Sequence, residues 1–162
     1  PSWIVSWARI WLNRTSLYSK ERIIMAYSTD VTLLSSATYT ANVTAADGTS
    51  TAVDTYRKGT FILNCSAVSG GATVDVAIQS YINGYWTDIA RFAQVSTVTT
   101  RVLWNIGGDL GTGTTTIEEA TQDLAITVST KRAGPWGTHI RATYTIAAAG
   151  SITFTVVGVV SS

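Results

Sequence analysis

The sequence has few charged residues, and they are unevenly distributed. Asp, Glu, Lys and Arg make up only 13% of the chain, roughly half the usual share of about 25%. Residues 1–24 carry four basic residues and one acidic residue, whereas the remainder carries seven basic and nine acidic residues. A nucleic-acid-binding domain needs a concentrated basic surface. The body of the chain offers none, so nucleic acid is not an expected partner.

Cysteine and long apolar runs are also scarce. Cys65 is the sole cysteine, so an intramolecular disulfide framework is excluded. It ends the apolar segment 61–65, a setting typical of a buried, inert thiol in a strand. No apolar run reaches the roughly 20 residues that a membrane-spanning helix needs. We therefore expect no membrane partner.

Groups for catalysis are few. His139 is the only histidine, so any Ser-His-Asp or Cys-His arrangement would have to use it. Neither His139 nor Cys65 lies in a nucleophile elbow or a cysteine-protease motif. Paired carboxylates for glycoside hydrolysis would have to come from Glu118, Glu119 and Asp123, of which the first two are adjacent and would point differently. We predict that the protein is not an enzyme and has no catalytic residues.

Metal and phosphate sites lack their usual patterns as well. A structural zinc site needs several Cys or His ligands, and each occurs once. Asp47 and Asp109 lie beside glycines but do not reproduce the spacing of a calcium loop, and turn formation explains both. The glycine-rich stretch 107–113 is not followed by the Gly-Lys-Ser/Thr of a phosphate loop. We predict no metal and no cofactor.

The body of the chain has the composition and pattern of a sheet protein. Thr is the commonest residue type and Val is frequent; both are β-branched and favour strands. Residues 72–82 alternate cleanly between apolar and polar, and Asn83-Gly84 supplies a tight hairpin turn. Residues 138–148 and 151–160 predict a C-terminal hairpin around Gly150. Similar segments predict further strands at 31–41, 59–67, 85–92, 95–104 and around 124–128.

About eight short strands without a convincing helix predict an all-β fold. We expect an antiparallel β-sandwich of jelly-roll type over residues 31–162, because that architecture protects the strand edges. Residues 1–30 form a separate, non-β N-terminal arm. There Trp3, Trp7 and Trp11 recur at helical spacing, which indicates an amphipathic helix or an aromatic arm that anchors in a partner. A different interpretation makes Met25, the only methionine, the native start and residues 1–24 a leader.

The aromatic residues of the body are candidates for recognition. Tyr85, Trp86, Trp104 and Trp136 are predicted at strand ends and in loops. There they could anchor a protein interface, stack on sugars, or plug the ends of the sandwich. We expect these residues, together with Trp3, Trp7 and Trp11 in the arm, to anchor an interface with a partner protein or with another subunit. Stacking on sugars would make the chain a lectin-like module.

Six segments of the body resemble small phage head proteins that coat or cement a capsid. They are residues 33–40, 56–64, 74–80, 86–89, 139–142 and 154–157. The resemblance implies a β-sandwich subunit, often trimeric, on the outer surface of the capsid, without catalytic residues. We therefore expect a virion decoration protein that binds the major capsid protein as a homotrimer. The alternatives are a carbohydrate-binding module and a tail or baseplate β-domain.

Overall fold

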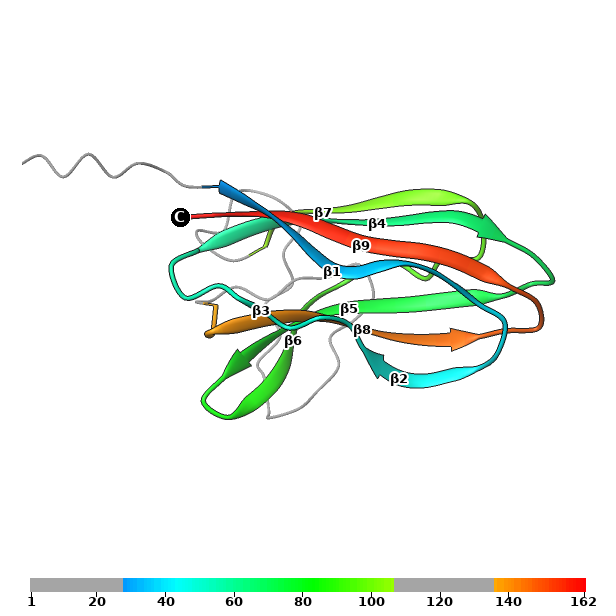
Figure 1. Cartoon of the computed structure of the whole chain (residues 1–162), viewed down its shortest axis with the longest axis horizontal. Coiled ribbons are helices and arrows are strands. Elements are labelled where there is room, and N and C mark those ends of the chain that lie inside the picture. Colours follow the sequence, from blue (N-terminus) through cyan, green and yellow to red (C-terminus); the bar gives the residue numbers. More distant parts are fainter. Residues whose placement is uncertain (1–27, 107–135) are drawn as a thin grey trace, which may run out of the picture.

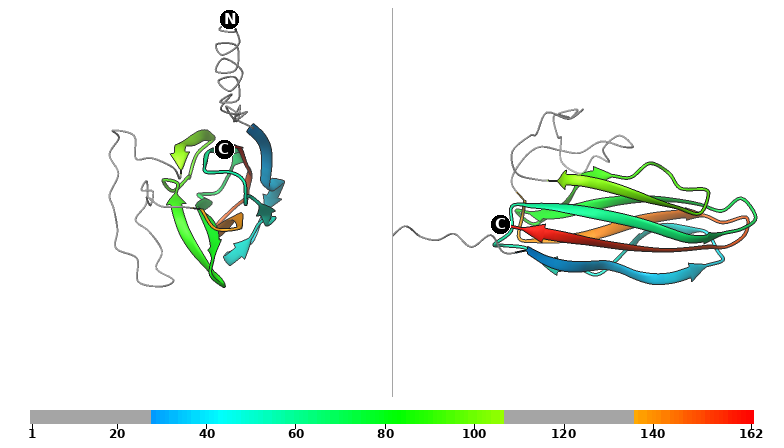
Figure 2. Two further views of the ribbon diagram at one scale, coloured as in Figure 1. Left: turned by 90° about the vertical axis from the view of Figure 1, so that its left-hand side faces the viewer. Right: turned by 90° about the horizontal axis from the view of Figure 1, so that it is seen from above.

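The chain folds into two antiparallel sheets packed face to face, as the composition predicted. We describe a computed structural model, in which residues 28–106 and 136–162 are placed. One layer, which we call sheet I, has the strand order β1-β9-β4-β7, and the other, sheet II, has the order β2-β8-β5-β6 with β3 also paired to β8. Figure 1 shows the two layers from the side, and Figure 2 shows them end-on and from above.

Sheet I is formed by β1 (Ser28–Tyr39), β9 (Ile152–Ser161), β4 (Lys58–Val68) and β7 (Thr99–Ile106). Sheet II is formed by β2 (Val43–Asp47), β3 (Thr51–Ala52), β8 (His139–Ala147), β5 (Thr73–Ile82) and β6 (Tyr85–Arg91). Both β2 and β3 pair with the same edge of β8, because β5 occupies the other edge. They therefore count as one interrupted strand position.

With β2 and β3 counted together, the strand order is that of a jelly roll. The pairs β1–β9, β2–β8, β4–β7 and β5–β6 are those of one long hairpin whose two arms are wrapped into a sandwich. A jelly roll consists of eight strands in two sheets and contains two Greek keys. The prediction of an antiparallel, jelly-roll-like β-sandwich is thus confirmed.

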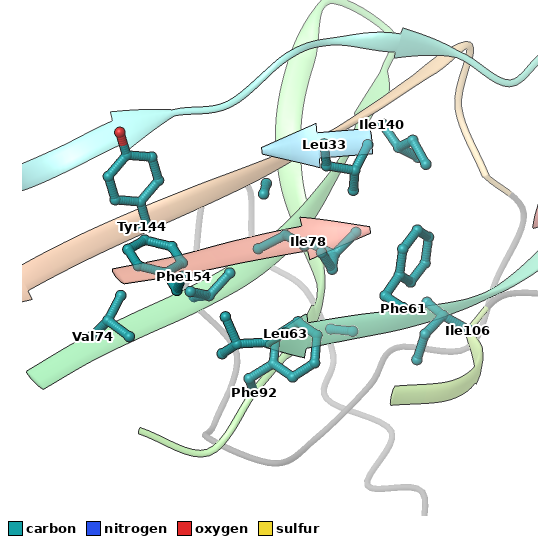
Figure 3. Close-up of a cluster of buried hydrophobic side chains, with 14 of the residues drawn as sticks. Leu33, Phe61, Leu63, Val74, Ile78, Phe92, Ile106, Ile140, Tyr144 and Phe154 are labelled. Carbon is teal, nitrogen blue, oxygen red and sulfur yellow. The ribbon is translucent and has the colours of Figure 1, made fainter. Parts of the chain in front are cut away.

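Alternating residues on the inner faces of the two sheets form the core (Figure 3). On β5, Val74, Val76 and Ile78 are buried, while Asp75 and Gln79 lie on the outer face. Ile140, Ala142, Tyr144 and Ile146 on β8 share the inner face, as their spacing predicted. The largest fully buried side chains are Phe61, Phe92 and Phe154.

The tight turn at Asn83-Gly84 is confirmed. The two residues have φ angles of 48° and 93°, both in the left-handed region that this hairpin turn requires. The turn connects β5 to β6 and aligns Tyr81 with Trp86. It therefore places two aromatic residues side by side at one end of sheet II.

The predicted C-terminal hairpin around Gly150 is wrong. Strands β8 and β9 belong to different sheets, so Gly150 lies in a connection between the two layers. A Cβ atom at Gly150 would lie 2.3 Å from the carbonyl oxygen of Ser69, in the connection from β4 to β5. The glycine is needed because these two connections cross at close range, rather than because it forms a hairpin turn.

Other differences concern strand boundaries. Strand β1 starts at Ser28, within the segment predicted as non-β arm. Strand β7 starts at Thr99, because Val95 forms only an isolated bridge with Val74. Strands β2 and β3 were not predicted. The possible strand around residues 124–128 lies outside the described residues, as does most of the predicted arm.

Candidate interaction surface

The outer face of sheet II carries a chain of polar side chains that crosses all four strands. Nη1 of Arg141 on β8 donates to Oδ2 of Asp47 on β2 at 2.7 Å. Nε of Arg141 donates to Oε1 of Gln79 on β5 at 2.9 Å, and Nε2 of Gln79 donates to Oδ1 of Asp88 on β6 at 2.8 Å. We call this outer face the polar face. Its side chains fix one another's rotamers across the sheet.

Register explains why these residues meet. Gln79 lies directly opposite both Arg141 and Asp88 in the two strand pairs that flank β5. Directly opposed residues of an antiparallel pair point to the same side of the sheet. Asp88 is 8% exposed, so its carboxylate would be costly to bury without the bond from Gln79.

An aromatic cluster adjoins the polar chain. Cζ of Arg141 lies 4.1 Å from the centroid of the Trp86 ring, a cation–π contact. Tyr81 contacts the Trp86 ring at 5.2 Å and the His139 ring edge-on at 6.5 Å, measured between centroids. Tyr85, in the adjacent turn, is 48% exposed. The polar face thus ends in exposed aromatic surface next to a fixed guanidinium group.

A shallow depression of about 240 Å³ lies beside the polar chain. Small residues leave the space, because Ala77 and Ala45 line it together with Thr143. Ala45 adopts a φ of 49° at the irregularity in the pairing of β2 with β8, an unusual conformation for alanine. The remaining lining side chains are polar or bear a polar group, namely Asp75, Gln79, Asp88, Arg91, Tyr144 and Thr145.

One end of the depression is fixed by a second polar cluster. Arg91 pairs with Asp75 at 3.7 Å, and Nε2 of Gln94 donates to Oδ2 of the same carboxylate at 2.8 Å. Both members of this ion pair are partly exposed, so water screens their attraction. The depression offers fixed donors and acceptors of both charge signs.

The outer face of sheet I is different in kind. Ile62 lies directly opposite Val157 on β9 and Val102 on β7, and Val157 lies opposite Thr32 on β1. Val102 and Val159 are 36% and 42% exposed. We call this surface the apolar face. Hydroxyl side chains surround its centre, where Thr155 Oγ1 donates to the Leu34 carbonyl at 2.7 Å.

The candidate anchors that the sequence proposed fall into three groups. Trp86 and Tyr85 lie together at the end of the polar face. Trp136 instead lies in the core, 8% exposed, with its ring centroid 6.1 Å from that of Phe61. It therefore closes one end of the sandwich. This is one of the three roles that the sequence allowed for the aromatic residues. Trp3, Trp7 and Trp11 lie outside the described residues, as does the side chain of Trp104.

Sequence reasoning did not identify the most connected residues of the polar face. Arg141, Gln79 and Asp88 lie within segments that were predicted as strands, but the register that brings them together across β5 was not predicted. The Asn-Gly turn fixes the pairing of β5 with β6. The pairing of β5 with β8, which brings Arg141 to Gln79, has no comparable local signal.

Cys65 and His139, the two residues that a catalytic arrangement would use, are not brought together. Cys65 is 1% exposed and points into the core, and burial raises the pKa of its thiol above the usual value. His139 lies on the outer face of sheet II, with Nδ1 3.0 Å from Oγ1 of Thr138. The two side chains are thus on opposite sides of a sheet.

The acidic residues considered as metal ligands do not gather in the described part of the chain. Asp47, one of the two turn aspartates, is paired with Arg141, whereas Asp109, Glu118, Glu119 and Asp123 lie outside the described residues. No cluster of three or more Cys, His, Asp or Glu residues occurs in the described part of the chain. Over residues 28–106 and 136–162 there is no helix that could cross a membrane.

The chain is similar in structure to part of a viral protein, whereas sequence comparison gives no match. No protein-family model matches the chain, and no curated protein matches its sequence. Among solved structures, it matches a chain of the "Structure of infectious bursal disease virus Gx strain" with a TM-score of 0.45 and 12% identity. The match covers 85% of this chain and 32% of the other. This chain therefore spans about a third of the length of that protein.

Proposed function

We propose that this chain is a structural virion protein that binds the outer surface of a phage capsid and stabilises it. The observation that carries the proposal is the polar face, where four strands hold Asp47, Arg141, Gln79 and Asp88 in one hydrogen-bonded chain. Side chains that are already ordered lose little entropy on binding. Such a surface is suited to repeated attachment to a regular lattice.

The fold and the sequence resemblance support the same proposal. Jelly rolls occur in viral capsid proteins, lectins and cupins, so the fold admits this function without proving it. The six segments that resemble capsid decoration proteins fall mainly on strands β1, β4, β5, β6, β8 and β9. The partner is accordingly the major capsid protein.

Attachment as a homotrimer would explain how a small subunit binds firmly. Three weak contacts on one rigid particle multiply through effective concentration. A protein that binds only the assembled shell stabilises the shell by mass action. Trp86 and Arg141 are our candidates for the main contacts, since Trp and Arg are enriched among residues that dominate binding energy.

The test uses empty shells of the parent particle. Purified protein should cosediment with the shells and raise the temperature at which they rupture. Arg141→Ala and Trp86→Ala should each weaken attachment by at least about tenfold, the effect of losing about 1.4 kcal/mol. Val98→Ser, at a site that is 65% exposed and outside the polar face, is the matched control. Cryo-EM reconstructions without density on the shell exterior would refute the proposal.

A carbohydrate-binding function is the second candidate. The depression beside the polar chain is lined by carboxylate, guanidinium, amide and hydroxyl groups that could bind sugar hydroxyls. Against this function, Arg141 already covers the Trp86 ring, so that ring lacks one free face for a sugar to stack on. Saturable binding on a glycan array that Asp88→Asn abolishes, without binding to shells, would favour this candidate.

A further inference from the structure

The apolar face has a composition that calls for a partner. Its central row, Thr32, Val157, Ile62 and Val102, crosses all four strands of sheet I and contains no charged side chain. Val159, one pair along β9, is 42% exposed. Three of the four residues in the row are aliphatic; Val157 and Ile62 are partly exposed and Val102 is 36% exposed. Adjacent aliphatic side chains of this kind differ from the isolated exposed apolar residues of ordinary surfaces.

Two charged residues on the described strands of this face indicate what the partner is. Asp30 on β1 and Lys58 on β4 are both exposed, and they flank β9 on opposite sides. Asp30 lies opposite Val159, and Lys58 lies opposite Ser161, one outward position further along. The face thus carries one negative and one positive charge, side by side near the same end.

This arrangement is self-complementary. A two-fold axis along β9 places the β1 side of one copy over the β4 side of the other. Val157 and Val159 then lie near the axis against their own counterparts, and Ile62 lies against Thr32 of the second copy. Asp30 of each copy comes to the end of the face that holds Lys58 of the other. An isologous interface requires this kind of matching of a surface with itself.

We propose that the apolar face is a two-fold interface with a second copy of this chain. The axis along β9 brings β1, β9 and β4 of the two copies together and leaves β7 unopposed. Three strands spaced about 4.8 Å apart and about 33 Å long give a contact of roughly 450–500 Å² per copy. That is below the roughly 800 Å² per partner of a standard stable complex. The contact is therefore weak and forms at high local concentration, where opposite charges favour it over other partners.

The interface is independent of capsid attachment, because it lies on the sheet opposite the polar face. It is also distinct from a threefold contact, since a two-fold interface doubles whatever unit is present. Neighbouring trimers, for example, would be linked subunit to subunit. Its test needs no shells, so failure here and failure of capsid binding are separate results.

The test is the molar mass of the purified chain as a function of concentration, measured by analytical ultracentrifugation at low ionic strength. The molar mass of the species present at low concentration should double as the concentration rises. Val159→Asp and Ile62→Asp should abolish the doubling. Ile82→Asp, which also adds a charge at an exposed aliphatic residue (41% exposed) but lies at the end of β5 on the other sheet, should leave it unchanged. Thermal melting checks that each variant is folded.

A charge exchange makes the test specific for a second copy. Asp30→Lys alone sets lysine against Lys58 of the mate at two symmetric places. It should therefore weaken association roughly tenfold at low salt, and Lys58→Asp alone should do the same. The double variant restores opposite pairs and should recover association to within about threefold of the parent. Absence of doubling at any concentration up to about 1 mM, or a double variant no better than the single ones, would overturn the proposal.

Discussion

The two outer faces of the sandwich have the same backbone pattern but are ordered by different forces. On sheet II, directed hydrogen bonds fix Arg141, Gln79 and Asp88 relative to one another. On sheet I, the outward positions of the central row hold Val157, Ile62 and Val102, which make no directed bonds of this kind. A polar surface that is fixed in advance selects its partner by geometry. An apolar surface associates through area and shape.

Both outer faces depend on the packing of the two sheets against each other. A substitution that disrupts the link between the sheets should therefore have the largest effect on stability. Gly48 connects the layers: its N–H donates to the Ala142 carbonyl at 2.8 Å, and the next N–H donates to the Leu33 carbonyl at 2.7 Å. A Cβ at Gly48 would lie 2.1 Å from the Leu33 oxygen. Gly48→Ala should therefore lower the free energy of unfolding by at least about 3 kcal/mol.

Gly71→Ala is the control for this variant. Gly71 has a φ of 76° but nothing within 4 Å of a Cβ, so the cost should be only about 1 kcal/mol of backbone strain. Chemical denaturation measures both values. Equal losses of unfolding free energy in the two variants would show that the Leu33 carbonyl does not lie in close contact with Gly48.

The next largest effect should fall on the polar face alone. Arg141→Ala removes the partner of Asp47 and Gln79 and uncovers the Trp86 ring. We expect a loss of about 1–2 kcal/mol in unfolding free energy, because the Arg141 side chain is only 19% exposed. Arg141→Lys should recover less than half, since an ammonium group cannot make both bonds in the plane of a guanidinium group.

Trp86 fluorescence separates this effect from a general loss of stability. Its emission should shift in folded Arg141→Ala protein, because the guanidinium group no longer lies over the ring. The protein contains other tryptophans, so the shift is measured against Trp86→Phe in the same background. Unchanged emission together with unchanged stability would mean that the polar chain does not order this face.

These faces also separate what the sequence could predict from what it could not. Strand β5 was predicted because Val74, Val76 and Ile78 alternate with polar residues, and Asn83-Gly84 determined its turn. Alternation, however, identifies only which side of a strand is buried, not which sheet the strand joins. For that reason β8 and β9 were assigned to one hairpin, although Ser69 and Ser151 pair where two connections between the layers cross.

The candidate site was predictable to a smaller extent. Trp86 and Tyr85 follow the Asn-Gly turn, and local sequence placed them at the end of a strand. Arg141 meets Gln79 only through a pairing that spans 62 residues of sequence, and no local feature specifies it. Trp136 looked like an exposed anchor because glycines and a proline surround it. Gly59 leaves room for its ring, since a Cβ there would lie 2.7 Å from the Trp136 side chain.

A smaller effect concerns the contact between the layers. Tyr39 donates its hydroxyl hydrogen to the Tyr144 hydroxyl at 3.1 Å and stacks near Phe154. Burial, with this hydrogen bond, raises the pKa of Tyr39 to about 12. The folded state therefore holds this proton more tightly than the unfolded chain. The resulting stabilisation is complete below about pH 10 and is lost as the pH rises from 10 towards 12.

Tyr39→Phe tests this pH dependence. Between pH 9 and pH 11.5 the parent should lose roughly 1 kcal/mol more unfolding free energy than the variant, a value reduced by solvent screening at a partly exposed ring. Denaturation at the two pH values gives the difference. Parallel losses in parent and variant would place the titrating group elsewhere.

The smallest effect on stability is expected for a substitution on the apolar face. This substitution gives the clearest test of the difference between the two faces. Val159 is 42% exposed at an outward strand position, and Val159→Thr replaces one of its methyl groups with a hydroxyl. Because threonine has the same shape and a similar preference for strands, the unfolding free energy should change by less than about 0.5 kcal/mol. Association between copies should nevertheless weaken, since the hydroxyl must give up water when the faces meet. A large loss of monomer stability would show instead that Val159 contributes to the fold of its own subunit, and the two faces would then differ less than their side chains indicate.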